Sequence, residues 1–190
     1  MDDYFLMPIE DVSSTSDGGT AVTGRIERGL VRVGDALQIV GFSDTQDTTC
    51  IGVEMLRKPV DTGTAGCNVK ILLRGTERKD VQRGQVLAKA GSAKSHKHFQ
   101  AQIELLSKEQ DGRQSPIFNN FRPQFHIRTA EMTGSIELPK DKEMVIPGGD
   151  ATVIVLLTNP VAIEEGDRFS FHESGRIVGT GVITKVLPDY

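Results

Sequence analysis

Hydrophobic and polar residues alternate with a period of two along much of the chain, which predicts short β-strands. In segment 20–27, the positions expected in a core are Thr20, Val22, Gly24 and Ile26. The positions expected to face solvent or a ligand are Ala21, Thr23, Arg25 and Glu27. The same period predicts two further core faces, one with Ile51, Val53 and Met55 and one with Val69, Ile71 and Leu73.

Glycines separate these segments at short intervals, a pattern typical of a barrel or a sandwich. Helical periodicity is confined to segment 76–83, which predicts one or two turns. Strands are also expected in the second half of the chain, at 99–106, 124–129, 133–138, 151–158, 168–172 and 176–187. Residues 151–157 are nearly all apolar or β-branched, which predicts a strand buried on both faces, and residues 107–123 form a long loop.

Segment 90–97 (AGSAKSHK) lacks large hydrophobic side chains, and we interpret it as a linker between two domains. A boundary near residue 92 gives domains of residues 1–92 and 93–190. Each domain is long enough for one small barrel. The expected fold class is therefore all-β, with two antiparallel β-barrels in tandem.

The charge balance argues against a general nucleic-acid-binding surface. The net charge is −4, and each half of the chain, divided near residue 92, has 11 basic and 13 acidic residues. Cys50 and Cys67 have no Cys or His at metal-ligand spacing, and we expect free thiols. No leader and no apolar run of about 20 residues is visible. We expect no membrane partner and a location in the cytoplasm or an organellar matrix.

Motifs of known catalytic sites are absent from the sequence. It contains neither a GxxxxGK[ST] phosphate loop nor a GxGxxG that opens a helix, and the glycine pairs at 18–19 and 148–149 are expected in hairpin turns. His96 and His98 have no evident third metal ligand at suitable spacing. His126 and His172 have no obvious Ser or Cys partner. We therefore expect no catalytic residue, no metal site and no enzymatic activity.

Several longer motifs follow one another along the chain. In the first half they are 5–12 (FLMPIEDV), 19–29 (GTAVTGRIERG), 52–58 (GVEMLRK), 72–75 (LLRG) and 83–89 (RGQVLAK). In the second half they are 106–108 (LSK), 121–125 (FRPQF), 132–139 (MTGSIELP), 144–148 (MVIPG) and 175–182 (GRIVGTGV). In this order the chain resembles the second and third domains of elongation factor Tu, a translational GTPase that delivers aminoacyl-tRNA, over residues 4–187.

The resemblance implies two β-barrels that follow a GTP-binding domain in the family. It assigns GTP and Mg²⁺ to that other domain, so that we expect no cofactor in this chain and no GTPase activity of its own. The implied partners are aminoacyl-tRNA and, through the family, the ribosome and an exchange factor. The implied role is in protein biosynthesis.

The resemblance also implies two sets of binding residues. An aminoacyl and 3′-adenosine pocket is implied on the first barrel, at Glu10, Asp11, Thr23, Glu54, Arg57, Asn68 and Leu72. Four of these also fall on strand faces opposite the hydrophobic positions, where a barrel presents residues to a ligand: Thr23, Glu54, Asn68 and Leu72. On the second barrel, contacts to the tRNA T stem are implied at Arg113, Gln124, Thr133 and Glu173. A few polar contacts to an RNA backbone require no strongly basic surface.

The chain departs from the family pattern mainly around the implied pocket. Segment 16–20 (SDGGT) lacks the family's Arg, and further departures are Ser13 for an aromatic residue, Cys67 for an acidic residue, Lys70 for Gly and Gln114 for His. These departures leave alternatives open. The chain is either a tRNA-binding unit or a protein-interaction module that keeps the fold and docks a separate GTPase domain or an exchange factor. A third reading is an isolated piece of a full-length GTPase.

Overall fold

The computed structural model describes residues 3–188, which divide into two compact units between Ser95 and His96. Helix among the described residues is limited to two single 3₁₀ turns, η1 (Arg78–Asp80) and η2 (Lys108–Gln110). The first of these lies inside segment 76–83, where the sequence predicts a short helix. The remaining regular structure is antiparallel β, as the sequence predicts, and the expected fold of tandem β-barrels is confirmed.

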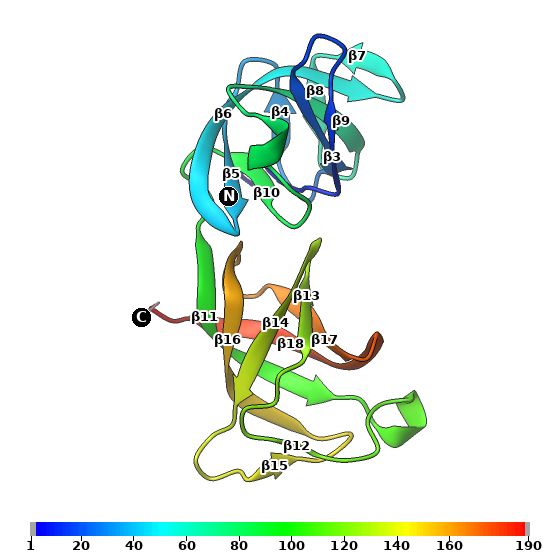
Figure 1. Ribbon diagram of the computed structural model, residues 1–190, viewed down its shortest axis with the longest axis vertical. Coiled ribbons are helices and arrows are strands. Elements are labelled where there is room, and N and C mark those ends of the chain that lie inside the picture. The colour runs from blue at the N-terminus through cyan, green and yellow to red at the C-terminus, as the bar shows by residue number, and fades with distance from the viewer. Residues whose placement is uncertain (1–2, 189–190) are drawn as a thin grey trace. The chain divides into compact units, whose positions relative to one another are not determined.

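The first unit is one curled sheet with two small additions (Figure 1). Its strands are β1 (Leu6–Pro8), β2 (Asp11–Ser14), β3 (Thr20–Arg25), β4 (Leu30–Arg32), β5 (Ala36–Gly41), β6 (Ser43–Met55), β7 (Lys58–Val60), β8 (Thr62–Thr64), β9 (Asn68–Arg74) and β10 (Val86–Lys89). The sheet order is β1-β10-β5-β6-β9-β3-β2, with β7 paired to β6 and β4 paired to β8. A bridge between Leu6 and Arg28 brings β1 back beside the segment that follows β3, so that the sheet curls around one interior.

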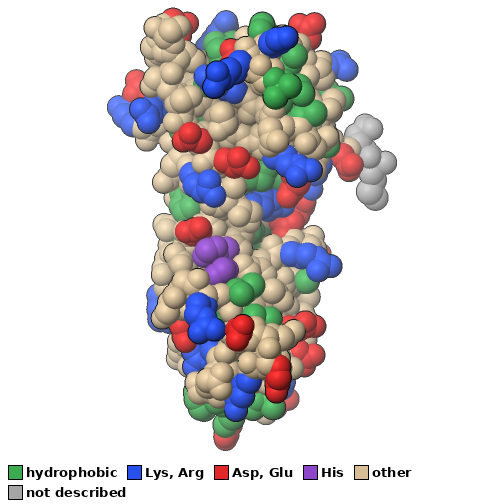
Figure 2. All heavy atoms as spheres, turned by 90° about the vertical axis from the view of Figure 1, so that its right-hand side faces the viewer, with side chains coloured by type: hydrophobic (Ala, Val, Ile, Leu, Met, Phe, Trp, Pro, Cys, Tyr) green, Lys and Arg blue, Asp and Glu red, His purple; other side chains and the backbone are tan. Residues whose placement is uncertain are grey.

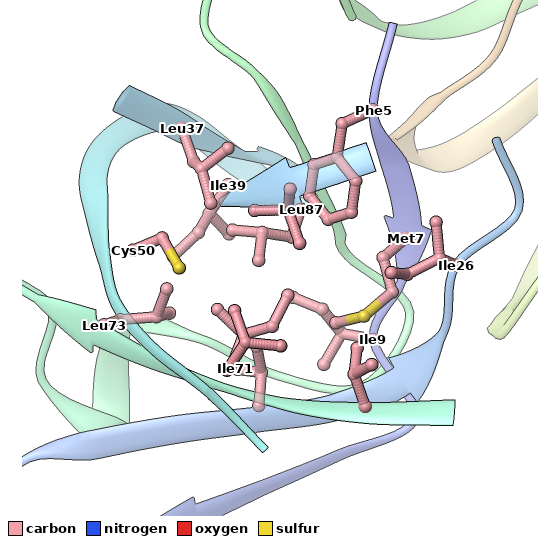
Figure 3. Packing of buried hydrophobic residues seen from close by; sticks show 14 of the residues in the cluster. Phe5, Met7, Ile9, Ile26, Leu37, Ile39, Cys50, Ile71, Leu73 and Leu87 are labelled. Atoms are coloured by element: carbon pink, nitrogen blue, oxygen red, sulfur yellow. The ribbon is translucent and has the colours of Figure 1, made fainter. Parts of the chain in front are cut away.

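The interior of this unit is filled by side chains that alternate along the strands. Figure 3 shows residues from β1, β5, β9 and β10 that point toward one another across this interior. Met7, Ile39, Ile71 and Leu87 are fully buried there. Each such side chain contributes about 2 kcal/mol of hydrophobic stabilisation on burial. The alternation predicted for segment 68–73 is therefore confirmed, because Val69, Ile71 and Leu73 are buried members of this core.

Two positions in the first unit differ from the predicted alternation. Ile51 is 42% exposed, although it was expected in the core. The register of β6 against β9 shifts between Cys50 and Gly52, so that Ile51 is the extra residue of a β-bulge and leaves the core face to Cys50. Ala21 is fully buried although it was expected to face outward, because its strand lies between β2 and β9 and its side chain is small.

The second unit contains a closed six-stranded barrel of order β11-β16-β14-β13-β17-β18 (Figure 1). Its strands are β11 (Ser95–Leu105), β12 (Ile117–Phe118), β13 (Gln124–Ile127), β14 (Ala130–Glu137), β15 (Met144–Val145), β16 (Asp150–Ala162), β17 (Arg168–Glu173) and β18 (Arg176–Val186). Strands β12 and β15 pair as a separate small sheet outside the barrel. The long loop predicted at 107–123 thus contains η2 and β12.

Aromatic rings packed over glycines fill the second barrel. Phe169 pairs in register with Gly181 and Phe171 with Gly179. A Cβ atom on either glycine would overlap the ring opposite it. Phe125 lies between the two rings, with centroids 5.8 Å from Phe169 and 6.1 Å from Phe171. The glycines of the motif 175–182 are therefore required because the rings occupy the space of their missing side chains.

Two predictions for the second unit are wrong. Residues 151–157 do not form a strand buried on both faces, since Leu156 is 47% exposed and every second residue of this run lies outside the core. Because β16 is part of a closed barrel, only the side chains on its inner face are buried. Apolar composition alone does not show which residues lie on that face. Residues 95–97 belong to β11 instead of a linker, and this strand continues into the part that pairs with β18 from Phe99 onward.

We expect Gly179→Ala to destabilise the second barrel by about 3 kcal/mol, because the added methyl group overpacks against a ring that is fully buried. Denaturant unfolding followed by circular dichroism measures this change. Lys185→Ala, at an exposed position of the same strand, should stay within about 0.5 kcal/mol of the parent. An unchanged unfolding midpoint for Gly179→Ala would show that the ring does not need the glycine.

Candidate functional site

Three neighbouring strands of the first unit bring polar side chains into one row on its outer face. Lys70 on β9 lies directly opposite Glu54 on β6 and directly opposite Thr23 on β3. Side chains opposed in this way have Cβ atoms about 5 Å apart. Asn68, the first residue of β9, lies two residues before Lys70 on the same face. The row therefore combines an acid, an amine, a hydroxyl and an amide within reach of one ligand.

A tight turn supplies the edge of this row. Met55 and Lys58 pair across the β6–β7 hairpin, and Leu56 and Arg57 form its tip with φ of 51° and 64°. Two consecutive left-handed residues are the geometry of a type I′ turn, which usually carries Asn-Gly. A left-handed residue other than Gly costs about 1 kcal/mol. The turn holds Leu56 almost entirely in solvent, at 93% exposure, beside the Arg57 side chain.

Glu10 closes the other side of the row. Its backbone N–H donates to Thr23 O at 2.8 Å, which fixes the segment between β1 and β2 against β3. The Arg83 guanidinium donates to Glu10 O at 3.1 Å and leaves the Glu10 carboxylate exposed. Together these elements line a pocket of about 450 Å³ formed by Glu10, Thr23, Gly24, Glu54, Leu56, Arg57, Asn68, Val69 and Lys70.

Two acids and two bases line this pocket without neutralising one another. Within residues 3–188, no ion pair joins the side chains of Glu10, Glu54, Arg57 or Lys70 to any partner. All four are partly or fully exposed. Their charges sum to zero, but they are separate and available to a ligand. The pocket can therefore bind a cation and an anion at the same time.

The pocket unites five of the seven residues implied for it by the sequence. Asp11 and Leu72 are not part of its lining. Asp11 accepts a hydrogen bond from Val12 N–H at 2.9 Å, and Leu72 packs over Gly52 one row away from the pocket. Sequence reasoning did not place Lys70 and Leu56 among the site residues. The signal for Lys70 was present, since it falls between Asn68 and Leu72 on the same alternating face.

The residues implied on the second barrel lie in two connected pairs. Gln124 on β13 is opposite Thr133 on β14, and both are exposed. The Arg113 guanidinium forms an ion pair with Glu173. Gln124 is also opposite His172, the residue before Glu173, which connects the two pairs.

Arg113 is strongly engaged within its own unit. Its guanidinium donates to Ser115 O at 3.2 Å, to Ser115 Oγ at 3.1 Å and to Pro116 O at 3.3 Å, and it lies 4.8 Å from the centroid of the Phe121 ring. These contacts tie the loop after η2 to the end of β17. The positive charge of Arg113 is thus largely neutralised by Glu173, and Gln124 and Thr133 are the more accessible members of the set.

A stacked pair of histidines lies on the same face of the second barrel. The imidazole rings of His126 and His172 have centroids 3.8 Å apart and an angle of 14° between planes. His172 Nε2 lies 2.9 Å from Ser170 Oγ, and His126 Nδ1 lies 3.7 Å from Glu131. The sequence-based statement that His172 lacks a serine partner is therefore wrong: Ser170 precedes it by two residues and shares its outer face. The nearby acid contacts the other ring, so this is not a Ser-His-acid triad.

Among the described residues, no three His, Cys, Asp or Glu side chains are grouped closely enough to hold a metal ion. His96 and His98 lie in β11, and His98 Nδ1 is 2.9 Å from Pro188 O. Cys50 and Cys67 are both free thiols, as expected from the sequence. Across residues 3–188 no helix has the length and apolar character needed to cross a bilayer.

Comparison with models of known protein families gives two matches. Residues 19–88 match elongation factor Tu domain 2, and residues 92–187 match the elongation factor Tu C-terminal domain. The chain belongs to the elongation factor Tu family. The resemblance inferred from the sequence motifs is thereby confirmed for both barrels.

The matches cover most residues of the two candidate sites. The domain 2 match contains Thr23, Glu54, Arg57 and Asn68 of the pocket, whereas Glu10 and Asp11 precede it. The match to the C-terminal domain contains Gln124, Thr133 and the histidine pair. This chain therefore contains the β-barrel portion of a translation elongation factor, from a family whose members interact with tRNA and the ribosome.

The histidine pair predicts a dependence of stability on pH. Burial, and secondarily the neighbouring His126 imidazole, lower the pKa of His172 below its ordinary value, despite an opposing contribution from Glu131. The unfolded chain therefore binds a proton at His172 more readily than the folded protein. We expect the free energy of unfolding to decrease as the pH falls from about 7 through the ordinary pKa of about 6.5.

The measurement is the denaturant midpoint of the parent and of His172→Gln at pH 7 and pH 5. We expect a smaller loss between the two pH values in His172→Gln, whereas His96→Gln, outside the stacked pair, should behave like the parent. Equal losses in the parent and in His172→Gln would contradict the prediction. NMR titration of the imidazole signals gives the direction of the His172 pKa shift directly.

Proposed function

We propose that this chain is the aminoacyl-tRNA-binding, two-barrel portion of an elongation factor Tu and that it has no GTPase activity by itself. The observation that carries this proposal is the pocket of the first barrel, where Glu10, Thr23, Glu54, Arg57 and Asn68 line one space of about 450 Å³. Membership of the elongation factor Tu family supports it.

The chemistry of the pocket suits the aminoacyl end of a tRNA. Such an end carries an ester, an ammonium group and a terminal adenosine. The Asn68 amide and the Thr23 hydroxyl can donate hydrogen bonds to the ester oxygens, and the carboxylates of Glu10 and Glu54 can bind the ammonium group. Leu56 at the turn and Leu72 one row away offer apolar surface to the adenine.

The second barrel supplies contacts of a different kind in this proposal. Gln124 and Thr133 present an exposed amide and hydroxyl that suit the sugar and phosphate oxygens of a T stem. Acidic and basic side chains are interspersed on the face shown in Figure 2. Binding should therefore involve few phosphates and depend less on salt than binding to a basic protein does. The ribosome and an exchange factor are further proposed partners, in the cytoplasm or an organellar matrix.

A second candidate function rests on the residues that depart from the family pattern. Lys70 lies in the pocket, and Asp17 occupies the turn between β2 and β3, where a hydrogen bond from Thr15 lowers the pKa of its carboxyl. Both residues change the charge presented to an RNA end. The alternative is a protein-interaction module that docks a separate GTPase domain or an exchange factor and has lost tRNA binding.

We expect aminoacylated tRNA to bind at least about tenfold more tightly than the same tRNA without its amino acid, because only the first engages the pocket. Asn68→Ala should weaken binding of the aminoacylated form about fivefold to tenfold, since it removes one hydrogen bond to the ester, worth about 1 kcal/mol. Fluorescence anisotropy at low salt measures both affinities with the complete chain.

The matched control is Asn159→Ala, at an exposed position of β16 far from the pocket in sequence and in a different unit, which should bind like the parent. Equal affinities of the parent for the two tRNA forms would reject the proposal in favour of the interaction module. Pull-down with a purified elongation factor GTPase domain then tests that alternative.

We further expect the pure chain not to bind GTP stoichiometrically, because its sequence has no phosphate loop to hold the nucleotide phosphates. Isothermal titration calorimetry with GTP and Mg²⁺ checks this. Tight binding of one GTP per chain would overturn the assignment of nucleotide binding to another domain.

A further inference from the structure

The pocket contains positively charged side chains whose role the proposed function alone does not explain. Two carboxylates, Glu10 and Glu54, and two cations, Arg57 and Lys70, line one space. Lys70 contributes the cation nearest its centre, since it stands between Glu54 and Thr23 on the middle one of three hydrogen-bonded strands. Arg57 lies at the tip of the hairpin and is exposed.

Lys70 is fixed by its strand, and its ammonium group has no partner of its own. Val69 and Ile71, on either side of it, are buried in the core, so that the Lys70 side chain points to the outer face. No ion pair of Lys70 exists within residues 3–188, although Glu54 stands opposite. An ammonium group placed beside Asn68 and Thr23 therefore remains free to bind an anionic group on a ligand.

The charges that line the pocket can be compared with the charges that different aminoacyl ends carry. Without Lys70 the pocket would have a net charge of −1 and would favour any additional cation. With Lys70 the net charge is zero, because two cations and two acids then line the same space. An amino acid esterified to RNA has lost its α-carboxylate and keeps its ammonium group, so that only an aspartyl or glutamyl end provides one positive and one negative group. A lysyl or arginyl end provides two positive groups.

We propose that Lys70, assisted by Arg57, makes this pocket prefer acidic aminoacyl ends over basic ones. The preference rests on the proposed function, because it requires the aminoacyl end to occupy this pocket. The ammonium group of the ligand lies toward Glu10 and Glu54, and its side-chain carboxylate lies toward Lys70. A basic side chain in the same position meets the Lys70 ammonium and is repelled.

The test uses one tRNA body charged separately with glutamate, glutamine and lysine, so that only the aminoacyl side chain differs. Affinities are measured with the complete chain by fluorescence anisotropy, at low and at moderate salt. For the parent we expect the glutamyl form to bind about tenfold more tightly than the lysyl form, with the glutaminyl form between them, and the ratio to shrink as salt increases.

Three variants make the test specific for Lys70. Lys70→Met keeps most of the length of the side chain and removes its charge, so the ratio between the affinities for the glutamyl and lysyl forms should fall to one or below. Lys70→Glu should invert it. Lys185→Met, at an exposed lysine of β18, should keep the ratio of the parent. Circular dichroism shows that each variant is folded.

The outcomes separate this inference from the proposed function. If every protein binds aminoacylated tRNA more tightly than uncharged tRNA, but Lys70→Met has the same glutamyl-to-lysyl ratio as the parent, the role of Lys70 is overturned and the proposed function stands. If the parent does not distinguish aminoacylated from uncharged tRNA, both are overturned. A ratio that falls in Lys70→Met and inverts in Lys70→Glu supports both.

Discussion

The pairing of β9 with β6 on one side and β3 on the other is the constraint on which the pocket depends. This register buries Val69, Ile71 and Leu73 and turns the intervening residues outward. A slip by one residue would exchange the two faces, placing Lys70 in the core and Ile71 in solvent. The cost of burying that charge excludes the slipped arrangement. The same alternation that stabilises the first barrel therefore also positions its candidate ligand groups.

Most of the fold could be predicted because a period of two has direct physical meaning in a sheet. Segment 68–73 follows the pattern at every position. Ile51 does not, because a bulge is a property of two paired strands and leaves no mark in one of them. Leu156 was misassigned for a related reason, since apolar composition does not tell which face of a strand meets a neighbouring layer.

The contact of Ser170 with His172 could have been predicted from their spacing of two residues along one strand. The stacking of His126 on His172 could not, because it depends on strands that are distant in sequence.

The two candidate sites use charge in different ways. In the pocket, Glu54 and Lys70 face each other without an ion pair, and their charges are available for recognition. On the second barrel, the Arg113 guanidinium donates hydrogen bonds to Ser115 and Pro116 and forms an ion pair with Glu173. These contacts hold a loop in place. The family resemblance implied both sets of residues from sequence, and the strand pattern independently supported part of the first set. The structure adds their hydrogen-bond and ion-pair partners, which separate side chains that are not paired within the described residues from Arg113, which mainly supports the fold.

The Phe–Gly pairs of β17 and β18 also limit which substitutions the second barrel can tolerate. Its interior is occupied by rings that fit against bare backbone, so a substitution at Gly179, Gly181 or Phe171 requires a compensating change across the strand pair. The outward residues Ser170 and Thr180 also pair across these two strands, but neither side chain fills the barrel interior. Substitution of the barrel interior is therefore constrained in pairs across two strands, whereas the outward residues are constrained only by their surface contacts.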